Sequence, residues 1–206
     1  MNRILLLVTF LFISWVSYAQ PSTQATNVVF TQGLTSTSLN ISWTTGDGTN
    51  KLVVISSGGG FFTPVNATDY TADTSPDFAV ATDKDGGSGV AKIVYGGTAN
   101  TVTVSNLPVA TFLTVRVYEF TLTGFLYNVT TASNNPMEAW FANANTNYTV
   151  PAGVTSITVK AWGGGGAGGG PGSSTNARAG GGGGAYVAGT ITTTPATVYP
   201  AVIGAG

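Results

Sequence analysis

The stretch TFLTVRVYEFT, residues 111–121, decides the fold. Its apolar residues Leu113, Val115 and Val117 recur at every second position, so they share one face of a β-strand. From residue 27 onward the same kind of β pattern returns in short runs at 39–43, 51–56, 91–95, 101–105 and 127–131. Glycine-containing turns separate these runs, and no segment beyond residue 19 has helical periodicity. About seven short strands over about 110 residues predict a β-sandwich in an all-β protein.

A glycine tract at residues 163–184 is the second conspicuous feature, with 13 glycines in 22 positions. One β-like run ends at Trp162, and another begins at Ala185 and extends to Thr194. Because glycine has no Cβ, such a tract between strands predicts close packing of main chains. The turn-forming segment Ser133–Pro136 indicates a boundary. We therefore expect an export signal at 1–19, a sandwich at 20–137 and a glycine-rich β domain at 138–206.

The first residues have the pattern of an export signal. Asn2 and Arg3 precede the apolar segment Ile4–Val16, and small residues favour cleavage after Ala19. Thirteen helical residues span about 20 Å, less than the ~30 Å hydrocarbon core, so no membrane span is expected after signal removal. We expect a secreted or cell-surface protein, exported by a bacterium.

Composition excludes several classes of function. The chain has no histidine and no cysteine, which excludes Ser–His–Asp and Cys–His catalysis and ordinary zinc sites. Its formal net charge is −1, which gives no basic patch for nucleic acid. Residues 163–168 fit G-x-G-x-x-G, but no acidic residue follows Glu138 and no helix is expected, so no nucleotide cofactor is predicted. We expect no cofactor and no enzymatic activity.

Two sets of carboxylates are candidates for a metal site or a catalytic site. Asp83 and Asp85, with Asp69, Asp73 and Asp77 upstream, could offer oxygen ligands to Ca²⁺, but they lack EF-loop spacing, and a solvated loop is the favoured interpretation. The only two glutamates, Glu119 and Glu138, would have to lie within about 10 Å of each other in a glycosidase. A structural role is favoured for both.

Aromatic residues bracket the glycine tract and are candidates for partner contact. Trp140, Tyr148, Trp162 and Tyr186 could stack on sugars, although packing over the glycine layer is the plainer interpretation. Arg178 is the one charge inside the tract and could lie at a loop tip that contacts a partner.

The first region resembles a fibronectin type III domain. LPVATFLTVRVYEF at 107–120 is similar to the E–F corner and F strand of that family, and Trp43 in LNISW matches its B-strand core tryptophan. The order of KLVVIS, IVYGG and YNVTTASNNP is similar to modules of secreted Bacteroidetes proteins. The family's corner tyrosine falls on Leu113 here, so the corner loses one hydrogen bond, worth ~1 kcal/mol.

The second region resembles a glycine-rich β domain of bacterial surface proteins and phage tail-fibre tips. The resemblance rests on YTVPAGVTSITVKAWGGGGAGGG and GGGGGAYVAGTITTTP, and spans about residues 140–206. It implies an adhesive or structural module whose partner is a surface polysaccharide or another cell-surface protein. It also implies a glycine-rich domain that is truncated at residue 206.

Two hypotheses of function follow. The first is a non-catalytic surface protein with the sandwich as spacer and the glycine-rich domain as binding tip. The alternative is an accessory part, spacer or carbohydrate-binding, of an exported polysaccharide-degrading enzyme.

Overall fold

The computed structural model describes residues 19–32, 37–85, 87, 89–140, 142, 144–166 and 181–203. Chain contacts divide the protein into two compact units, Met1–Trp140 and Phe141–Gly206. The predicted export signal lies outside the described residues, apart from Ala19. Within the described part, the helical content is one 3₁₀ turn, η1 (Thr71–Asp73), so the all-β prediction is confirmed.

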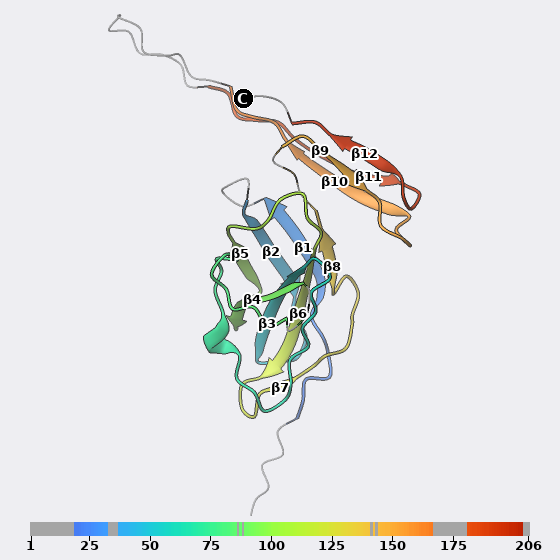
Figure 1. The fold of residues 1–206 in the computed structure, drawn as a ribbon. Coiled ribbons are helices and arrows are strands. Elements are labelled where there is room, and N and C mark those ends of the chain that lie inside the picture. Colours follow the sequence, from blue (N-terminus) through green and yellow to red (C-terminus); the bar gives the residue numbers. More distant parts are fainter. Residues whose placement is uncertain are drawn as a thin grey trace, which may run out of the picture. The chain divides into compact units, whose positions relative to one another are not determined.

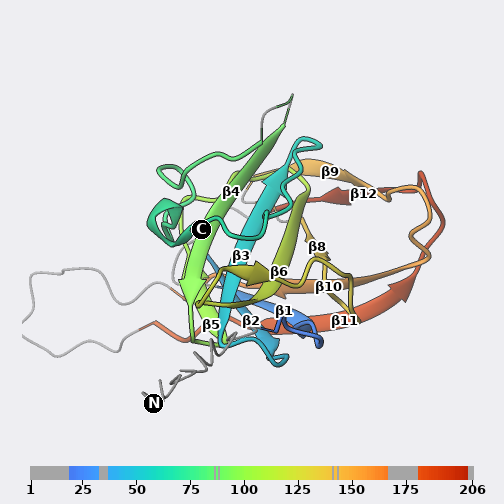
Figure 2. The same cartoon turned by 90° about the horizontal axis from the view of Figure 1, so that it is seen from below.

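The first unit is a two-layered sandwich of antiparallel strands (Figures 1 and 2). One sheet has the order β1-β2-β5, and the other has the order β4-β3-β6-β7 with β8 also paired to β6. The predicted β-sandwich is therefore confirmed. The strands are β1 (Thr26–Gln32), β2 (Leu39–Thr44), β3 (Asn50–Ser57), β4 (Val90–Gly97), β5 (Thr101–Val104), β6 (Leu113–Thr121), β7 (Leu126–Tyr127) and β8 (Met137–Ala139).

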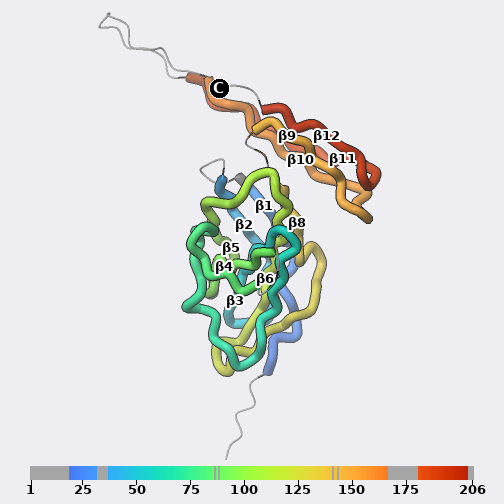
Figure 3. Tube along the Cα trace, viewed as in Figure 1, coloured from blue at the N-terminus to red at the C-terminus, as the bar shows by residue number. Residues whose placement is uncertain are grey.

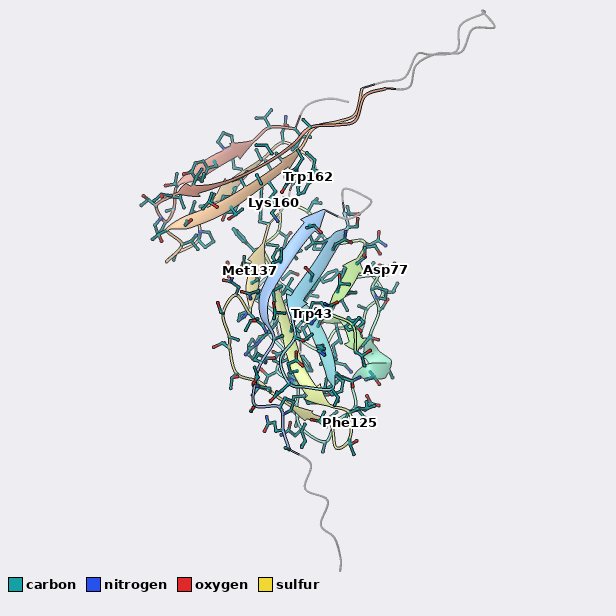
Figure 4. The ribbon with its side chains drawn as sticks, turned by 180° about the vertical axis from the view of Figure 1, so that it is seen from behind. Trp43, Asp77, Phe125, Met137, Lys160 and Trp162 are labelled. Carbon is teal, nitrogen blue, oxygen red and sulfur yellow. The ribbon has the colours of Figure 1, made fainter. Side chains whose placement is uncertain are left out.

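The core between the two sheets follows the predicted alternation. In β2, Ile41 and Trp43 are buried while Ser42 between them is exposed. Trp43, which is labelled in Figure 4, lies within the sandwich. Its ring centroid is 6.0 Å from that of Tyr95 of β4. In β6 the predicted inward residues, Leu113 among them, are fully buried.

A second buried layer covers the outer face of β3, β4 and β6. The segment 61–85 runs across this face (Figure 3), and it contributes Tyr70 to an apolar cluster with residues from β3, β4, β6 and β7. Tyr118 donates a hydrogen bond to the Phe62 carbonyl at 2.7 Å, and Tyr127 donates one to the Thr68 carbonyl at 2.9 Å. Burial raises the pKa of both tyrosines. Two-sided burial explains why β3 has a continuous β-branched run instead of strict alternation.

The last strand of the second sheet is interrupted. β7 pairs with one end of β6 and β8 with the other, and the predicted strand at 127–131 is wrong beyond Tyr127. Between them, side-chain amides take the place of a strand. Asn135 accepts from the Val117 amide at 3.1 Å and donates to the Val117 carbonyl at 2.8 Å, and Gln24 accepts from the Glu119 amide at 2.9 Å.

The boundary segment Ser133–Pro136 therefore belongs to the sandwich. Asn135 is buried and also donates to the Ala25 carbonyl at 2.8 Å. Strand pairing resumes directly after Pro136, since Met137 pairs with Val115. A turn-rich composition predicted the break in the strand, but not that the chain would return to the same sheet.

The second unit consists of two antiparallel pairs of strands. β10 (Ser156–Trp162) pairs with β11 (Tyr186–Thr192), and β9 (Thr146–Thr149) pairs with β12 (Val198–Ala201). β11 ends at Thr192, two residues before the predicted strand end at Thr194. Val150 is the one buried apolar side chain among the described residues of this unit. The unit therefore has a much smaller core than the sandwich.

Candidate binding surface of the glycine-rich unit

The described ends of the glycine tract continue the β10–β11 hairpin. The Gly163 amide donates to the Ala185 carbonyl at 2.7 Å, and the Gly166 amide donates to the Gly182 carbonyl at 2.9 Å. These bonds keep the register of the hairpin, so the two main chains remain paired where the side chains end. Residues 167–180 lie outside the described part of the chain.

Gly184 shows why glycine is required in this ladder. A Cβ at this position would lie 2.0 Å from the Gly163 carbonyl oxygen, far inside van der Waals contact. At Gly183, one residue earlier, a Cβ would meet nothing within 4 Å. The prediction of close main-chain packing is therefore confirmed at Gly184, and it does not extend to every glycine of the tract.

Trp162 and Tyr186 form an exposed aromatic pair at the end of the β10–β11 hairpin, next to the glycine tract. They are opposite each other in the register, and their ring centroids lie 5.3 Å apart at an interplanar angle of 41°. Trp162 is 45% exposed and Tyr186 is 55% exposed. The pair therefore packs ring against ring and still offers aromatic surface to solvent.

The same face of the hairpin continues with polar side chains. Alternation along β10 places Lys160 and Thr158 on the face of Trp162 (Figure 4). The hydroxyls of Thr158 and Thr190 meet across the two strands at 3.1 Å. An aromatic pair, a lysine and a hydroxyl pair thus follow one another along one face, which we call the aromatic face.

The opposite face of the hairpin is apolar. It contains Val159, Val187 and Ile191, which are all exposed. The hairpin thus has two chemically different surfaces, of which the aromatic face has the polar groups.

The other predicted contact residues lie on other elements or outside the described residues. Trp140 is half-buried in the first unit, next to β8. Tyr148 lies on β9 opposite Tyr199, in the other strand pair of the second unit. Arg178 lies outside the described residues.

The two main calcium candidates, Asp83 and Asp85, bind backbone amides, and Asp73 forms an ion pair with Lys84 at 2.8 Å. Asp83 accepts from the amides of Asp85 and Ala91, both at 3.0 Å. Asp85 accepts from the Phe61 amide at 3.1 Å and from the Gly89 amide at 3.1 Å, and the Phe61 bond does most to lower the pKa of Asp85. Among the described residues, no three His, Cys, Asp or Glu side chains gather in a way that could hold a metal ion. These hydrogen bonds tie Asp83 to Ala91 and Asp85 to Phe61 and Gly89, so the two carboxylates have a structural role.

Neither glutamate has the setting of a catalytic carboxylate. Glu119 is fully buried in the sandwich, where its carboxylate accepts from the Gly46 amide at 2.7 Å and lies 3.9 Å from the Lys51 amine. Burial raises the pKa of Glu119, and the Gly46 hydrogen bond opposes that shift. Glu138 lies on β8 opposite Thr114. A fully buried carboxylate cannot reach a sugar chain in solvent.

One open cavity of about 310 Å³ lies at the end of β3. Its lining has hydroxyl groups, glycines and one phenylalanine, and no side chain that titrates near neutral pH. These residues are Ser56, Ser57, Gly58, Gly59, Gly60, Thr111, Phe112 and Thr114. The lining contains no acid–base pair for catalysis.

Across the described residues, no helix has the length and apolar character needed to cross a membrane.

Comparisons with known proteins match each unit separately. Residues 142–206 match the family described as a glycine-rich domain. Among solved structures, the fibronectin type III domain of human collagen XX is similar at 20% identity and a TM-score of 0.30, over 56% of this chain and 98% of that one. None of the curated proteins compared with the chain matches it significantly. The glycine-rich family thus covers the second unit, which contains the aromatic face.

Proposed function

We propose that this protein is a non-catalytic structural or adhesive protein of the cell surface or the secreted fraction. The sandwich serves as a spacer, and the glycine-rich unit serves as the binding tip. The observation that carries the proposal is the exposed Trp162–Tyr186 pair at the point where a main-chain ladder enters the glycine tract.

The sandwich has properties expected of a spacer. Its second sheet is buried on both faces, and side-chain amides of Gln24 and Asn135 hold its interrupted edge. Its aspartates fix loops instead of surrounding a cavity. A unit of this kind holds its shape without a bound ligand.

The binding tip has the opposite character. All seven residues of β11 are exposed, and the described ladder beyond Trp162 and Tyr186 is glycine apart from Ala185. Exposed aromatic side chains on a thin hairpin suit contact with an extended polymer or with another surface protein. The sequence pattern of residues 1–19 supports export, and the proposed location is the surface of a bacterial cell or its surroundings.

Attachment of cells tests the proposal, with the ladder as the point of intervention. In the organism that carries the gene, Gly184→Ala should reduce attachment to a surface, because its Cβ would lie 2.0 Å from a carbonyl oxygen across the ladder. Gly183→Ala makes the same chemical change where a Cβ meets nothing, and it should attach like wild type. Equal attachment of both variants and of a strain lacking the gene would refute an adhesive role.

A further inference from the structure

We propose that the aromatic face binds an acidic polysaccharide, a chain of sugars that bear carboxylate groups. This inference deepens the proposed adhesive function and rests on it. It assigns a ligand class to Trp162, Tyr186, Lys160 and the Thr158–Thr190 pair.

The register of the hairpin places these groups in one row. The rings of Trp162 and Tyr186 meet at 5.3 Å, and the hydroxyls of Thr158 and Thr190 meet at 3.1 Å. Both contacts join residues directly opposite each other, and each contact lies two positions along β10 from Lys160. Four residues of strand cover about 13 Å. The row is therefore long enough to contact more than one sugar ring.

Each group in the row matches a part of such a polymer. The apolar C–H face of a sugar ring packs on exposed aromatic carbon, as Trp162 and Tyr186 offer it. Threonine hydroxyls both donate and accept hydrogen bonds, as sugar hydroxyls do. Lys160 adds a positive charge, which attracts a carboxylate and gives a neutral sugar no comparable gain.

The charge distribution along the chain favours an anionic ligand at this unit. All eight Asp and Glu residues of the protein lie at or before Glu138. Residues 142–206 carry Lys160 and Arg178 as their only charged side chains. The glycine-rich unit is therefore positive in a protein whose formal net charge is −1, and no carboxylate in it repels an acidic polymer.

Nucleic acid is also anionic and also stacks on aromatic rings. Its binding depends on several cations that neutralise successive phosphates, and this unit has two. A polymer with one carboxylate per sugar has a lower charge density than duplex DNA, and it makes more use of hydroxyl contacts than nucleic acid does. The acidic polysaccharide is therefore the better match.

Binding of the full chain to polygalacturonate, with dextran as the neutral probe, tests the proposal by affinity electrophoresis and calorimetry. We expect binding to polygalacturonate that weakens as salt rises from about 50 to about 300 mM, and much weaker binding to dextran. Trp162→Ala should weaken binding by about tenfold. Lys160→Gln should weaken it by about threefold, since it removes one partly exposed charge.

Val187→Thr is the matched control, because Val187 is exposed on the opposite face and threonine has nearly the same shape. It should bind like wild type. Hydrogen exchange of the β10 and β11 amides shows whether Trp162→Ala preserves the pairing of the two strands. If the pairing is lost, the effect of Lys160→Gln on binding tests the proposal independently.

Three results would overturn the ligand class: equal binding of dextran and polygalacturonate, unchanged binding by Lys160→Gln, or displacement of polygalacturonate by an equal charge of single-stranded oligothymidylate. Each leaves the adhesive role intact if Gly184→Ala still impairs attachment. Loss of the attachment effect as well would remove both proposals.

Discussion

Replacement of Asn135 by alanine tests whether a side-chain amide closes the open edge of β6. The amide accepts from the Val117 N–H at 3.1 Å and donates to the carbonyls of Val117 and Ala25, both at 2.8 Å. Asn135 is 1% exposed, so water does not replace these partners without opening the edge. An unsatisfied buried polar group costs about 1–3 kcal/mol.

We therefore expect Asn135→Ala to lower the free energy of unfolding by about 3 kcal/mol. This value assigns the full cost of an unsatisfied buried group to the Val117 N–H. It assigns a smaller cost to each of the two carbonyls, because a carbonyl oxygen has a second lone pair for another partner. Against a typical stability of about 5–15 kcal/mol, this is a large fraction. It corresponds to a fall of about 10 °C in the melting temperature of a unit of this size.

Urea unfolding followed by circular dichroism measures the effect, and an unchanged m-value shows that the comparison concerns stability alone. Asn135→Asp keeps the shape and the acceptor but loses both donors and buries a charge, so it should destabilise at least as much. Asn40→Ala is the control, because the Asn40 amide oxygen accepts an exposed hydrogen bond from the Thr103 hydroxyl, and its loss should cost about 0.5 kcal/mol. If Asn135→Ala costs no more than Asn40→Ala, the amide does not hold the edge.

The remaining predictions concern the ladder, the buried glutamate and the aspartate loop. Gly184→Ala should increase amide exchange in the β10–β11 ladder whereas Gly183→Ala should not, and equal exchange in both variants would contradict the close packing. Because burial raises the pKa of Glu119 in the folded chain, the folded state binds that proton more tightly than the unfolded state. The stability from this group is full below the ordinary glutamate value of 4.5 and is lost as pH rises through the raised pKa. Urea unfolding at a series of pH values should show that Glu119→Gln lacks this decline, and parallel profiles for the two proteins would contradict it. Thermal melts with calcium and with chelator should coincide, because Asp83 and Asp85 already bind backbone amides, and a shifted midpoint would show a calcium site instead.

Local patterns predicted the two-layered sandwich well. Alternation in residues 39–43 and 111–121 gave the inward faces of β2 and β6, because side-chain direction in a strand depends only on position along it. The covered outer face of β3 was not predicted. Its signs in the sequence were aromatic residues in a segment without strand pattern, such as Phe62 and Tyr70, and only tertiary structure shows which surface they cover.

The interrupted edge of β6 illustrates a second limit of sequence reasoning. Asn135 and Gln24 lie in segments with turn or loop composition, and their amides act on residues that are distant in the chain. A buried asparagine that replaces a strand has the same local pattern as an exposed turn asparagine. No periodicity separates the two.

The candidate site was predicted in part. Trp162 and Tyr186 flank the glycine tract, and hairpin register brings such flanking residues opposite each other. Tyr148 lies beyond the turn at 151–153, so the same reasoning could not place it on this hairpin. Lys160 and Thr190 were missed, although their spacing from the aromatic pair is the period of a strand.

The β10–β11 hairpin has only two strands, which limits the strength of binding at the proposed binding tip. A two-stranded hairpin with two exposed faces is marginally stable by itself, and each glycine that becomes ordered loses more entropy than any other residue. Because association itself costs free energy, a single site with one aromatic pair and few charges is expected to bind weakly. A polymer with repeated sugars offers many equivalent sites, and a surface offers many copies of the protein. In the proposed adhesive function, linked weak contacts would together hold firmly while each one stays reversible, as attachment to an extended polysaccharide requires.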